Sequence, residues 1–285
     1  MGHAPGAARL ESCAGKLKRL QSMKNKLVFT LFLLLLAGCH PSASVPASLP
    51  SPSPTVVRCA KAGEIVSIEM DSPTRGYGYR INLYLPPCYH DQTIAYPVLY
   101  LIPGRGSGPA AWFNAGADPA ADRLIRDGSL PPFLIVATEN TDSDPQGEVI
   151  FKDVIPYIEE HYRVLADRRH RAVAGGSLGG IAAYRLAFQH PEAFSSVGIF
   201  GSGVIAGEEA ALQGWLAALT DATPLKVFLA CGENDPLMFE RARVTALLLA
   251  GSEIPFVFVP LKGGHDYPSW VGGLDQYFAW LTQDW

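Results

Sequence analysis

The sequence predicts an α/β fold, with a mostly parallel sheet covered by helices on both faces and an antiparallel hairpin at one edge. Short apolar runs, typical of buried strands, alternate with longer segments in which apolar residues recur at helical spacing. Alternation of this kind calls for parallel strands joined by helical crossovers. Before these units, Glu64 to Met70 and Tyr79 to Leu85 flank the turn D-S-P-T-R-G-Y-G, which is typical of a hairpin.

The expected elements can be placed along the chain by their residue ranges. Beyond the hairpin, strands are expected at Val98 to Ile102, Phe133 to Ala137, Ala172 to Ala174, Ser196 to Phe200, Lys226 to Ala230 and Pro255 to Val259. Helices are expected at Pro119 to Arg126, Glu148 to Tyr162, Leu178 to His190, Glu208 to Leu219, Pro236 to Ala250 and Gly273 to Trp285. In such sheets, functional sites lie at the carboxyl ends of the strands.

A serine lies at one of these strand-to-helix junctions. The segment Arg171 to Tyr184 reads R-A-V-A-G-G-S-L-G-G-I-A-A-Y, in which G-x-S-x-G separates an apolar strand from a helical pattern. The glycines allow the close approach of chains in a sharp turn, which presents the Ser177 hydroxyl above the sheet. The Leu178 N–H then lies at a helix N-terminus, where it can stabilise an oxyanion. The alternative is a glycine-rich turn with an N-capping serine, but the junction favours a nucleophile elbow.

A serine hydroxyl is a weak nucleophile, so it needs a base and a carboxylate that orients the base. Asp235 in C-G-E-N-D-P and His265 in G-G-H-D-Y-P each follow a predicted strand, in the order serine, acid, histidine. We therefore predict a triad of Ser177, Asp235 and His265. The alternatives are that Asp235 only caps the next helix and that His265 is a solvated loop residue. Asp266 is a competing acid, but adjacent residues in an extended loop point apart.

The loop after Ile102 reads P-G-R-G-S-G and is expected to supply the second oxyanion donor. Gly104 allows close approach, and the Arg105 N–H is the first choice of donor, with Gly106 the alternative. No histidine and cysteine cluster has metal-ligand spacing, which disfavours zinc hydrolysis, and no cofactor is expected. The residues assigned to substrate binding are Gly104, Gly106, Trp112 and Trp270.

The composition is that of a globular protein with one large core. The chain has 285 residues, of which 48% are hydrophobic and 18% charged, and this balance disfavours intrinsic disorder. The net charge of −4 shows no basic excess, so nucleic acid is not expected as a partner.

The N-terminal region has the layout of a processing signal. Two lysines precede the apolar run Leu27 to Leu36, which is too short to span a bilayer and leads into L-A-G-C at Cys39. L-A-G-C resembles the bacterial lipobox, which implies cleavage before Cys39 and a lipid on its sulfur; the alternative is a buried helix. We expect an upstream extension (1–22), a lipoprotein signal peptide (23–39), a Ser/Pro/Ala-rich linker (40–55) and a catalytic α/β domain (56–285). Translation from Met23 would give a signal peptide of ordinary form. The expected location is the cell envelope, on a membrane facing the periplasm or exterior.

The remaining cysteines differ in their surroundings. Cys231 lies in an apolar run and is expected to be a buried, inert thiol. Cys59 and Cys88 flank the hairpin and lie nearly opposite each other if Met70 pairs with Tyr79. Because exported proteins can form disulfides, a Cys59–Cys88 bridge is predicted.

Several segments resemble the esterase D or putative-esterase family of α/β-hydrolases, over nearly all of Ile65 to Trp285. This family includes S-formylglutathione hydrolases, feruloyl and acetyl-xylan esterases, enterochelin esterases and mycolyltransferases. By this likeness Ser177, Asp235 and His265 form the triad. Many relatives have a histidine where this chain has Pro103, and a small residue where it has Arg105. The matching segments are L-Y-L-I-P-G, V-I-P-Y-I-E-E-H-Y-R, A-G-G-S-L-G-G, C-G-E-N-D and G-G-H-D-Y-P-S-W.

The resemblance and the N-terminal signal together imply a lipid-anchored serine carboxylic ester hydrolase of the α/β-hydrolase fold. Its expected substrates are small-molecule or carbohydrate-linked esters, cleaved through an acyl-enzyme. The alternative is an acyltransferase, because a sugar or other alcohol can attack the same acyl-enzyme in place of water. A peptidase of the prolyl oligopeptidase type is disfavoured because no propeller domain precedes the catalytic one. A non-catalytic binding protein is disfavoured because no triad residue is missing.

Overall fold

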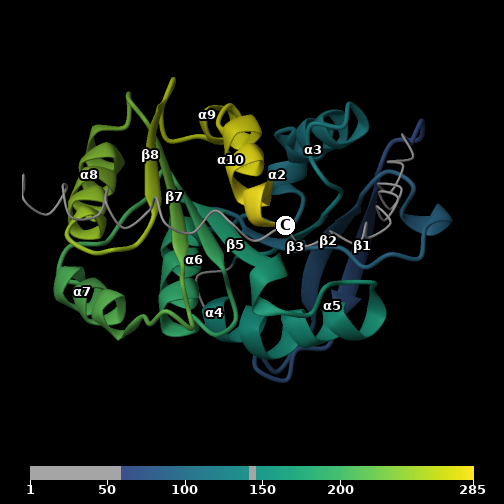
Figure 1. Cartoon of the computed structure of the whole chain (residues 1–285), viewed down its shortest axis with the longest axis horizontal. Helices are drawn as coiled ribbons and strands as arrows, with labels where there is room; N and C mark the ends of the chain where they lie inside the picture. Colours follow the sequence, from purple (N-terminus) through teal and green to yellow (C-terminus); the bar gives the residue numbers. More distant parts are fainter. Residues whose placement is uncertain (1–58, 141–145) are drawn as a thin grey trace, which may run out of the picture. The chain divides into compact units, whose positions relative to one another are not determined.

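The computed structural model describes residues 59–140 and 146–285. Within these residues, eight strands form one sheet in the order β1-β2-β4-β3-β5-β6-β7-β8 (Figure 1). The strands β3 to β8 are parallel, whereas β2 pairs antiparallel with both β1 and β4. This is the predicted α/β-hydrolase architecture. The strands are β1 (Glu64–Met70), β2 (Tyr79–Leu85), β3 (Val98–Ile102), β4 (Leu134–Thr138), β5 (Arg171–Gly176), β6 (Ser196–Phe200), β7 (Lys226–Gly232) and β8 (Phe256–Leu261).

Helices cover both faces of the sheet and bury two apolar clusters against it (Figure 1). β5 lies between the clusters, because Val173 packs into one and Ala172 and Ala174 into the other. The helices on the Val173 face are α4 (Gln146–Val149), α5 (Ile155–His161), α6 (Leu178–Gln189), α7 (Glu209–Ala218) and α8 (Pro236–Ala250). Those on the opposite face are α2 (Ala111–Asn114), α3 (Ala117–Arg126), α9 (Tyr267–Val271) and α10 (Leu274–Leu281).

The predicted strands and long helices are confirmed, with shifts at their ends, and three local features differ from the predictions. The helices α2 and α9 were not predicted, because four or five residues are too few to show a helical period. The expected helix at 148–162 contains a π-helical segment, Ile150–Val154, between α4 and α5. Within this segment the buried Asp153 accepts hydrogen bonds from Ser72 Oγ at 2.5 Å and Thr74 N–H at 3.1 Å. The π-helical turn therefore anchors the loop between β1 and β2.

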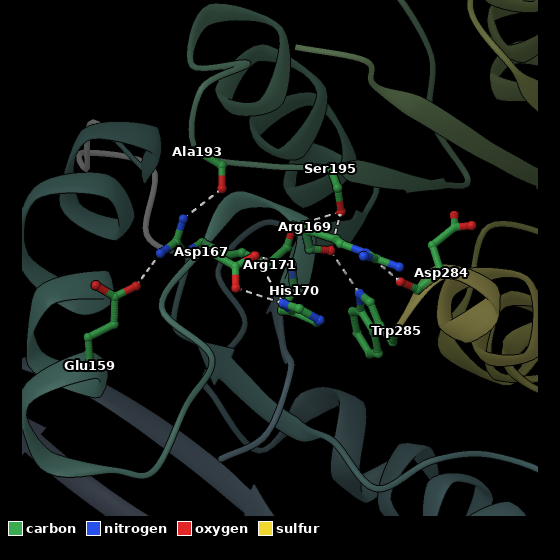
Figure 2. Close-up of polar contacts among 9 residues, drawn as sticks. All are labelled: Glu159, Asp167, Arg169, His170, Arg171, Ala193, Ser195, Asp284 and Trp285. Carbon is green, nitrogen blue, oxygen red and sulfur yellow. Dashed lines mark hydrogen bonds and ion pairs between the residues drawn. The ribbon is translucent and has the colours of Figure 1, made fainter. Parts of the chain in front are cut away.

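Polar contacts hold the amino end of β5 in place (Figure 2). The Arg171 guanidinium is largely buried and pairs with Glu159 of α5. At the chain terminus, Trp285 Nε1 donates a hydrogen bond to the Arg169 carbonyl at 3.2 Å. These contacts tie α5 and the C-terminal segment to the strand that ends just before Ser177.

A disulfide joins Cys59 to Cys88, with their Cα atoms 5.8 Å apart. The register of the hairpin pairs Met70 with Tyr79, as the predicted bridge required. The bridge ties the start of the described domain to the connection between β2 and β3.

The expectations for residues 1–55, including the signal peptide, the lipidated Cys39 and the linker, lie outside the described residues. In residues 59–140 and 146–285, no helix combines the length and the apolar character needed to cross a bilayer.

We expect the Cys59–Cys88 bridge to contribute about 3 kcal/mol to the free energy of unfolding, because it closes a loop in the unfolded chain. The two cysteines are 29 residues apart. Urea unfolding of the Cys59→Ser/Cys88→Ser variant should show a loss of this size, and reductant should destabilise the wild type by a similar amount. Equal stability of the variant and the oxidised wild type, or two free thiols in exported protein, would contradict the bridge.

Candidate active site

Three side chains from three strand ends form a hydrogen-bonded row. Ser177 follows β5, Asp235 follows β7 and His265 follows β8. His265 Nε2 lies 2.8 Å from Ser177 Oγ, and His265 Nδ1 lies 2.5 Å from Asp235 Oδ2. The imidazole therefore bridges the hydroxyl and the carboxylate. The structure brings together the three residues that the sequence predicted as a triad.

Ser177 occupies a sharp turn in an unusual backbone conformation. Its φ is 56° and its ψ is −122°, a combination that side-chain-bearing residues rarely adopt. The adjacent glycines are required for close packing, because a Cβ at Gly175 would overlap the Gly179 backbone and a Cβ at Gly179 would overlap Pro103. The Ser177 hydroxyl makes no capping bond to α6. This geometry is that of a nucleophile elbow and does not fit the alternative of an N-capping serine.

The two candidate acids have different hydrogen-bond partners. Asp235 is largely buried, and its Oδ1 accepts a bond from Met238 N–H at 3.3 Å while Oδ2 faces His265. Asp266 instead caps α9, accepting from Ser269 N–H at 2.8 Å and Ser269 Oγ at 2.6 Å. These bonds from Ser269 hold the pKa of Asp266 below its ordinary value. Asp235 thus both caps α8 and faces the imidazole, and Asp266 is engaged by its own helix.

The backbone around Ser177 offers donors for an oxyanion. Leu178 is the first residue of α6, so its N–H belongs to the first turn, whose N–H groups have no intrahelical acceptor. Across from it, a Cβ at Gly104 would lie 3.7 Å from Ser177 Cβ, which places this loop directly against the hydroxyl. Arg105 and Gly106 follow in an exposed turn closed by a bond from Ser107 N–H to the Gly104 carbonyl at 3.2 Å. The predicted second donor, Arg105, and its alternative, Gly106, therefore both follow the residue that packs against Ser177.

Two residues that were not predicted from the sequence hold this loop. Gly104 N–H donates to Tyr267 Oη at 2.9 Å. The fully buried Asn140 brackets the loop, donating from Nδ2 to the Pro103 carbonyl at 2.8 Å and from its N–H to the Ser107 carbonyl at 2.9 Å. Only the position of each residue along the chain gives a signal: Asn140 lies two residues after the end of β4, and Tyr267 lies two residues after His265.

The residue before Asn140, Glu139, is a buried carboxylate that forms two ion pairs. The Glu139 carboxylate pairs with Arg75 and with Arg80, and its side chain is only 4% exposed. Although burial alone would raise the pKa of Glu139, hydrogen bonds from the two arginines hold it below its ordinary value. The charged carboxylate therefore stays paired at neutral pH and fixes the chain that leads into Asn140.

The two tryptophans assigned to substrate binding are not placed to contact a substrate. Trp112 is 0% exposed and Trp270 is 2% exposed. Trp112 Nε1 donates to the Ile102 carbonyl at 3.0 Å, and the Trp270 ring packs edge-on against His265, with ring centroids 5.3 Å apart. Both rings lie beneath the site and support its loops, which corrects the sequence-based assignment.

Cys231 lies near the candidate acid without taking part in the hydrogen-bonded row. Burial and the nearby Asp235 carboxylate raise the pKa of its thiol to about 12, so the thiol is protonated and inert, as predicted. In the part of the chain that the structure describes, no three His, Cys, Asp or Glu side chains are arranged to hold a metal ion.

Comparison with known proteins supports a common family. The model of the family described as "Putative esterase" matches residues 72–281. The chain is 27% identical over 226 residues to an endo-1,4-beta-xylanase/feruloyl esterase of Xylanibacter ruminicola, covering 73% of this chain and 30% of that protein. It is 26% identical over 227 residues to the iron(III) salmochelin esterase of Escherichia coli, covering 70% of this chain and 53% of that one. The chain thus spans about a third and about half of the lengths of these relatives.

The fold is shared with solved esterase structures. A feruloyl esterase module from Clostridium thermocellum, complexed with sinapinate, superposes with a TM-score of 0.68 at 17% identity, covering 87% of this chain and 97% of the module. The family match extends over well more than half of the 285 residues. The chain belongs to the putative esterase family.

Proposed function

We propose that this protein is a serine carboxylic ester hydrolase in which Ser177 is the nucleophile, His265 the general base and Asp235 the orienting acid. The observation that carries the proposal is the continuous row of hydrogen bonds from Asp235 through His265 to Ser177. Ser177 lies at the sharp turn between β5 and α6 that is typical of a nucleophile elbow. Family membership supports the same activity.

The geometry supports a two-step reaction through an acyl-enzyme. In the first step His265 Nε2 takes the proton of the Ser177 hydroxyl while Oγ forms a bond to the ester carbonyl carbon. The Leu178 N–H and an N–H of the loop at Arg105 stabilise the negative oxygen. When the intermediate collapses, the bond to the alcohol oxygen breaks, and the imidazolium returns the proton to that leaving alcohol.

In the second step a water molecule replaces the alcohol. His265 takes a proton from the water while the water oxygen attacks the acyl carbon. His265 then gives this proton to Ser177 Oγ when the bond between Oγ and the acyl carbon breaks and the acid leaves. The Asp235 carboxylate accepts a hydrogen bond from Nδ1, which keeps Nε2 free to act as the base and stabilises the imidazolium. No cofactor takes part in either step.

The proposed substrates are small-molecule or carbohydrate-linked esters. Two relatives support this class by their names, a xylanase/feruloyl esterase and a salmochelin esterase.

We also propose that the protein is attached to a membrane of the cell envelope by a lipid on Cys39, facing the periplasm or exterior. The support is the lysine, apolar and L-A-G-C pattern of the N-terminal segment. The disulfide adds independent support, because structural disulfides are typical of proteins exported from the cytoplasm.

Ser177→Ala should lower kcat for nitrophenyl acetate by about 10⁶-fold, because only the oxyanion donors and binding remain. Ser252→Ala, which alters a partly buried serine in a distant turn, is the matched control and should keep full turnover. Mass spectrometry of quenched wild type should show one added acetyl group on the peptide that contains Ser177. Near-normal turnover by Ser177→Ala would exclude this serine as the nucleophile.

Asp235→Asn should lower turnover by about three to four orders of magnitude, whereas Asp266→Asn should keep most activity. Asparagine can cap both helices, so thermal melts should show folded proteins in each case. Steady-state kinetics then separate the two acids. A folded, active Asp235→Asn beside an inactive Asp266→Asn would assign the role to Asp266.

Tyr267→Phe should lower kcat by about two- to tenfold with little change in KM, because it removes the acceptor that holds Gly104 N–H. Tyr157→Phe, which alters a partly buried tyrosine on α5, is the control and should leave both constants unchanged. A Tyr267→Phe enzyme with wild-type kcat would show that the loop at Gly104 keeps its position without this bond.

Cys39→Ser should abolish labelling of the full chain by an alkyne fatty acid in a bacterial host, whereas wild type should be marked. Cys231→Ser, which removes a thiol of the folded domain, is the control and should be labelled like wild type. Equal marking of the Cys39→Ser protein would exclude Cys39 as the site of lipidation.

A further inference from the structure

A hollow of the surface adjoins the loop at residues 103–108, which we call the oxyanion loop. It has a volume of about 700 Å³, which falls within the range of about 300–1,000 Å³ that is typical of small-molecule sites. One wall is the face of the β1–β2 hairpin at the edge of the sheet, and the other is the segment that leads from the oxyanion loop into α2. The lining residues are Ser67, Ile68, Glu69, Arg80, Ile81, Asn82, Ser107, Gly108, Pro109, Ala110, Ala111 and Asn114.

The hairpin register explains why one wall is polar. Ser67 pairs with Asn82, and Glu69 pairs with Arg80, across the two strands. Because strand side chains alternate between faces, these four point to the same side of the sheet. The opposite wall adds two more polar side chains, Ser107 and Asn114.

Four neutral groups of this pocket are available to a ligand. Among the described residues, the side chains of Ser67, Asn82, Ser107 and Asn114 have no hydrogen-bond partner. Two amides and two hydroxyls can both donate and accept, which matches the hydrogen-bonding capacity of several alcohol groups.

The charges that line the pocket balance. Of the described lining residues, Glu69 and Arg80 are the charged ones, and they have opposite signs. Arg80 also pairs with Glu139, and that carboxylate pairs in turn with Arg75, so these two arginines and two glutamates carry no net charge together. The pocket therefore offers little net attraction to an anion or a cation, and a neutral ligand fits it best.

The pocket begins at the loop that faces the nucleophile. Ser107 lines it, and Ser107 N–H donates to the Gly104 carbonyl at 3.2 Å. Gly104 in turn packs against Ser177, where a Cβ would lie 3.7 Å from Ser177 Cβ. A group bound in the pocket would thus lie on the oxyanion-loop side of an ester held at Ser177.

We propose that this pocket binds the uncharged, hydroxyl-rich portion of the ester, a sugar or similar polyol, through Ser67, Asn82, Ser107 and Asn114. The inference rests on the proposed esterase function and adds the residues that select the substrate. An aromatic acyl group in the same place would desolvate four polar side chains without giving them partners, which disfavours it.

Two variants, Asn82→Leu and Asn114→Ala, test the proposal with three esters. The esters are a sugar 6-O-acetate, nitrophenyl acetate and methyl ferulate. Each variant should lower kcat/KM for the sugar acetate by several fold, and the double variant by about tenfold or more, mainly through KM, because neutral hydrogen bonds to the ligand are lost. The values for nitrophenyl acetate and methyl ferulate should stay unchanged. Gln189→Leu, which removes an exposed amide at the far end of α6, is the matched control and should behave as wild type.

The controls separate this inference from the proposed function. If wild type fails to hydrolyse nitrophenyl acetate, the esterase function itself fails. If wild type cleaves nitrophenyl acetate but the two variants leave the sugar acetate unaffected, or wild type does not cleave the sugar acetate at all, the sugar subsite is overturned. A loss confined to methyl ferulate would assign the pocket to the acyl portion and also overturn the proposal.

The Asn114→Ala change lies at the exposed end of α2, so it provides a folded variant if Asn82→Leu disturbs the hairpin.

Discussion

Ser177 is held in a backbone conformation that costs on the order of 1–3 kcal/mol for a residue with a side chain, and much of the surrounding structure serves to maintain it. The buried strand β5 fixes the residue from below, and the glycines on either side let α6 and the oxyanion loop approach it. A bond from Ser177 N–H to the Phe200 carbonyl at 2.9 Å ties the turn to the next strand. These contacts with β5, β6, α6 and the oxyanion loop therefore offset the strain of the turn.

The loops around this turn are also tied to one another. Tyr267 links the loop after β8 to Gly104 in the loop after β3, and Asn140 links the segment after β4 to the same loop. Asp235 links the loop after β7 to His265. Each bond joins segments that follow two different strands of the sheet, so the sheet positions all of these groups through one scaffold. Such support is what a site needs if its donors are to be aimed before a substrate arrives.

Much of this arrangement could be predicted because it depends on order along the chain. Ser177, Asp235 and His265 each follow a buried apolar run, and parallel strands bring such positions to one edge. The hairpin register also follows from its turn, which is why the disulfide was predictable. Tyr267 and Asn140 lie beyond strand ends, which the sequence shows, but they were missed because no local pattern encodes their bonds to the backbone of a distant loop. Trp112 and Trp270 were wrongly assigned to substrate binding. The sequence does not distinguish an aromatic ring that faces a ligand from one that packs beneath the loops of the site.

In the proposed reaction, Ser177, the Leu178 N–H and the loop at Gly104 surround one reacting carbon. A crystal structure of the protein after reaction with a phosphonate ester tests this arrangement most directly. We expect phosphorus bonded to Ser177 Oγ, with one phosphonyl oxygen within hydrogen-bond distance of Leu178 N–H and of an N–H at Arg105 or Gly106. Phosphorus on another side chain, or a phosphonyl oxygen turned away from both donors, would contradict it.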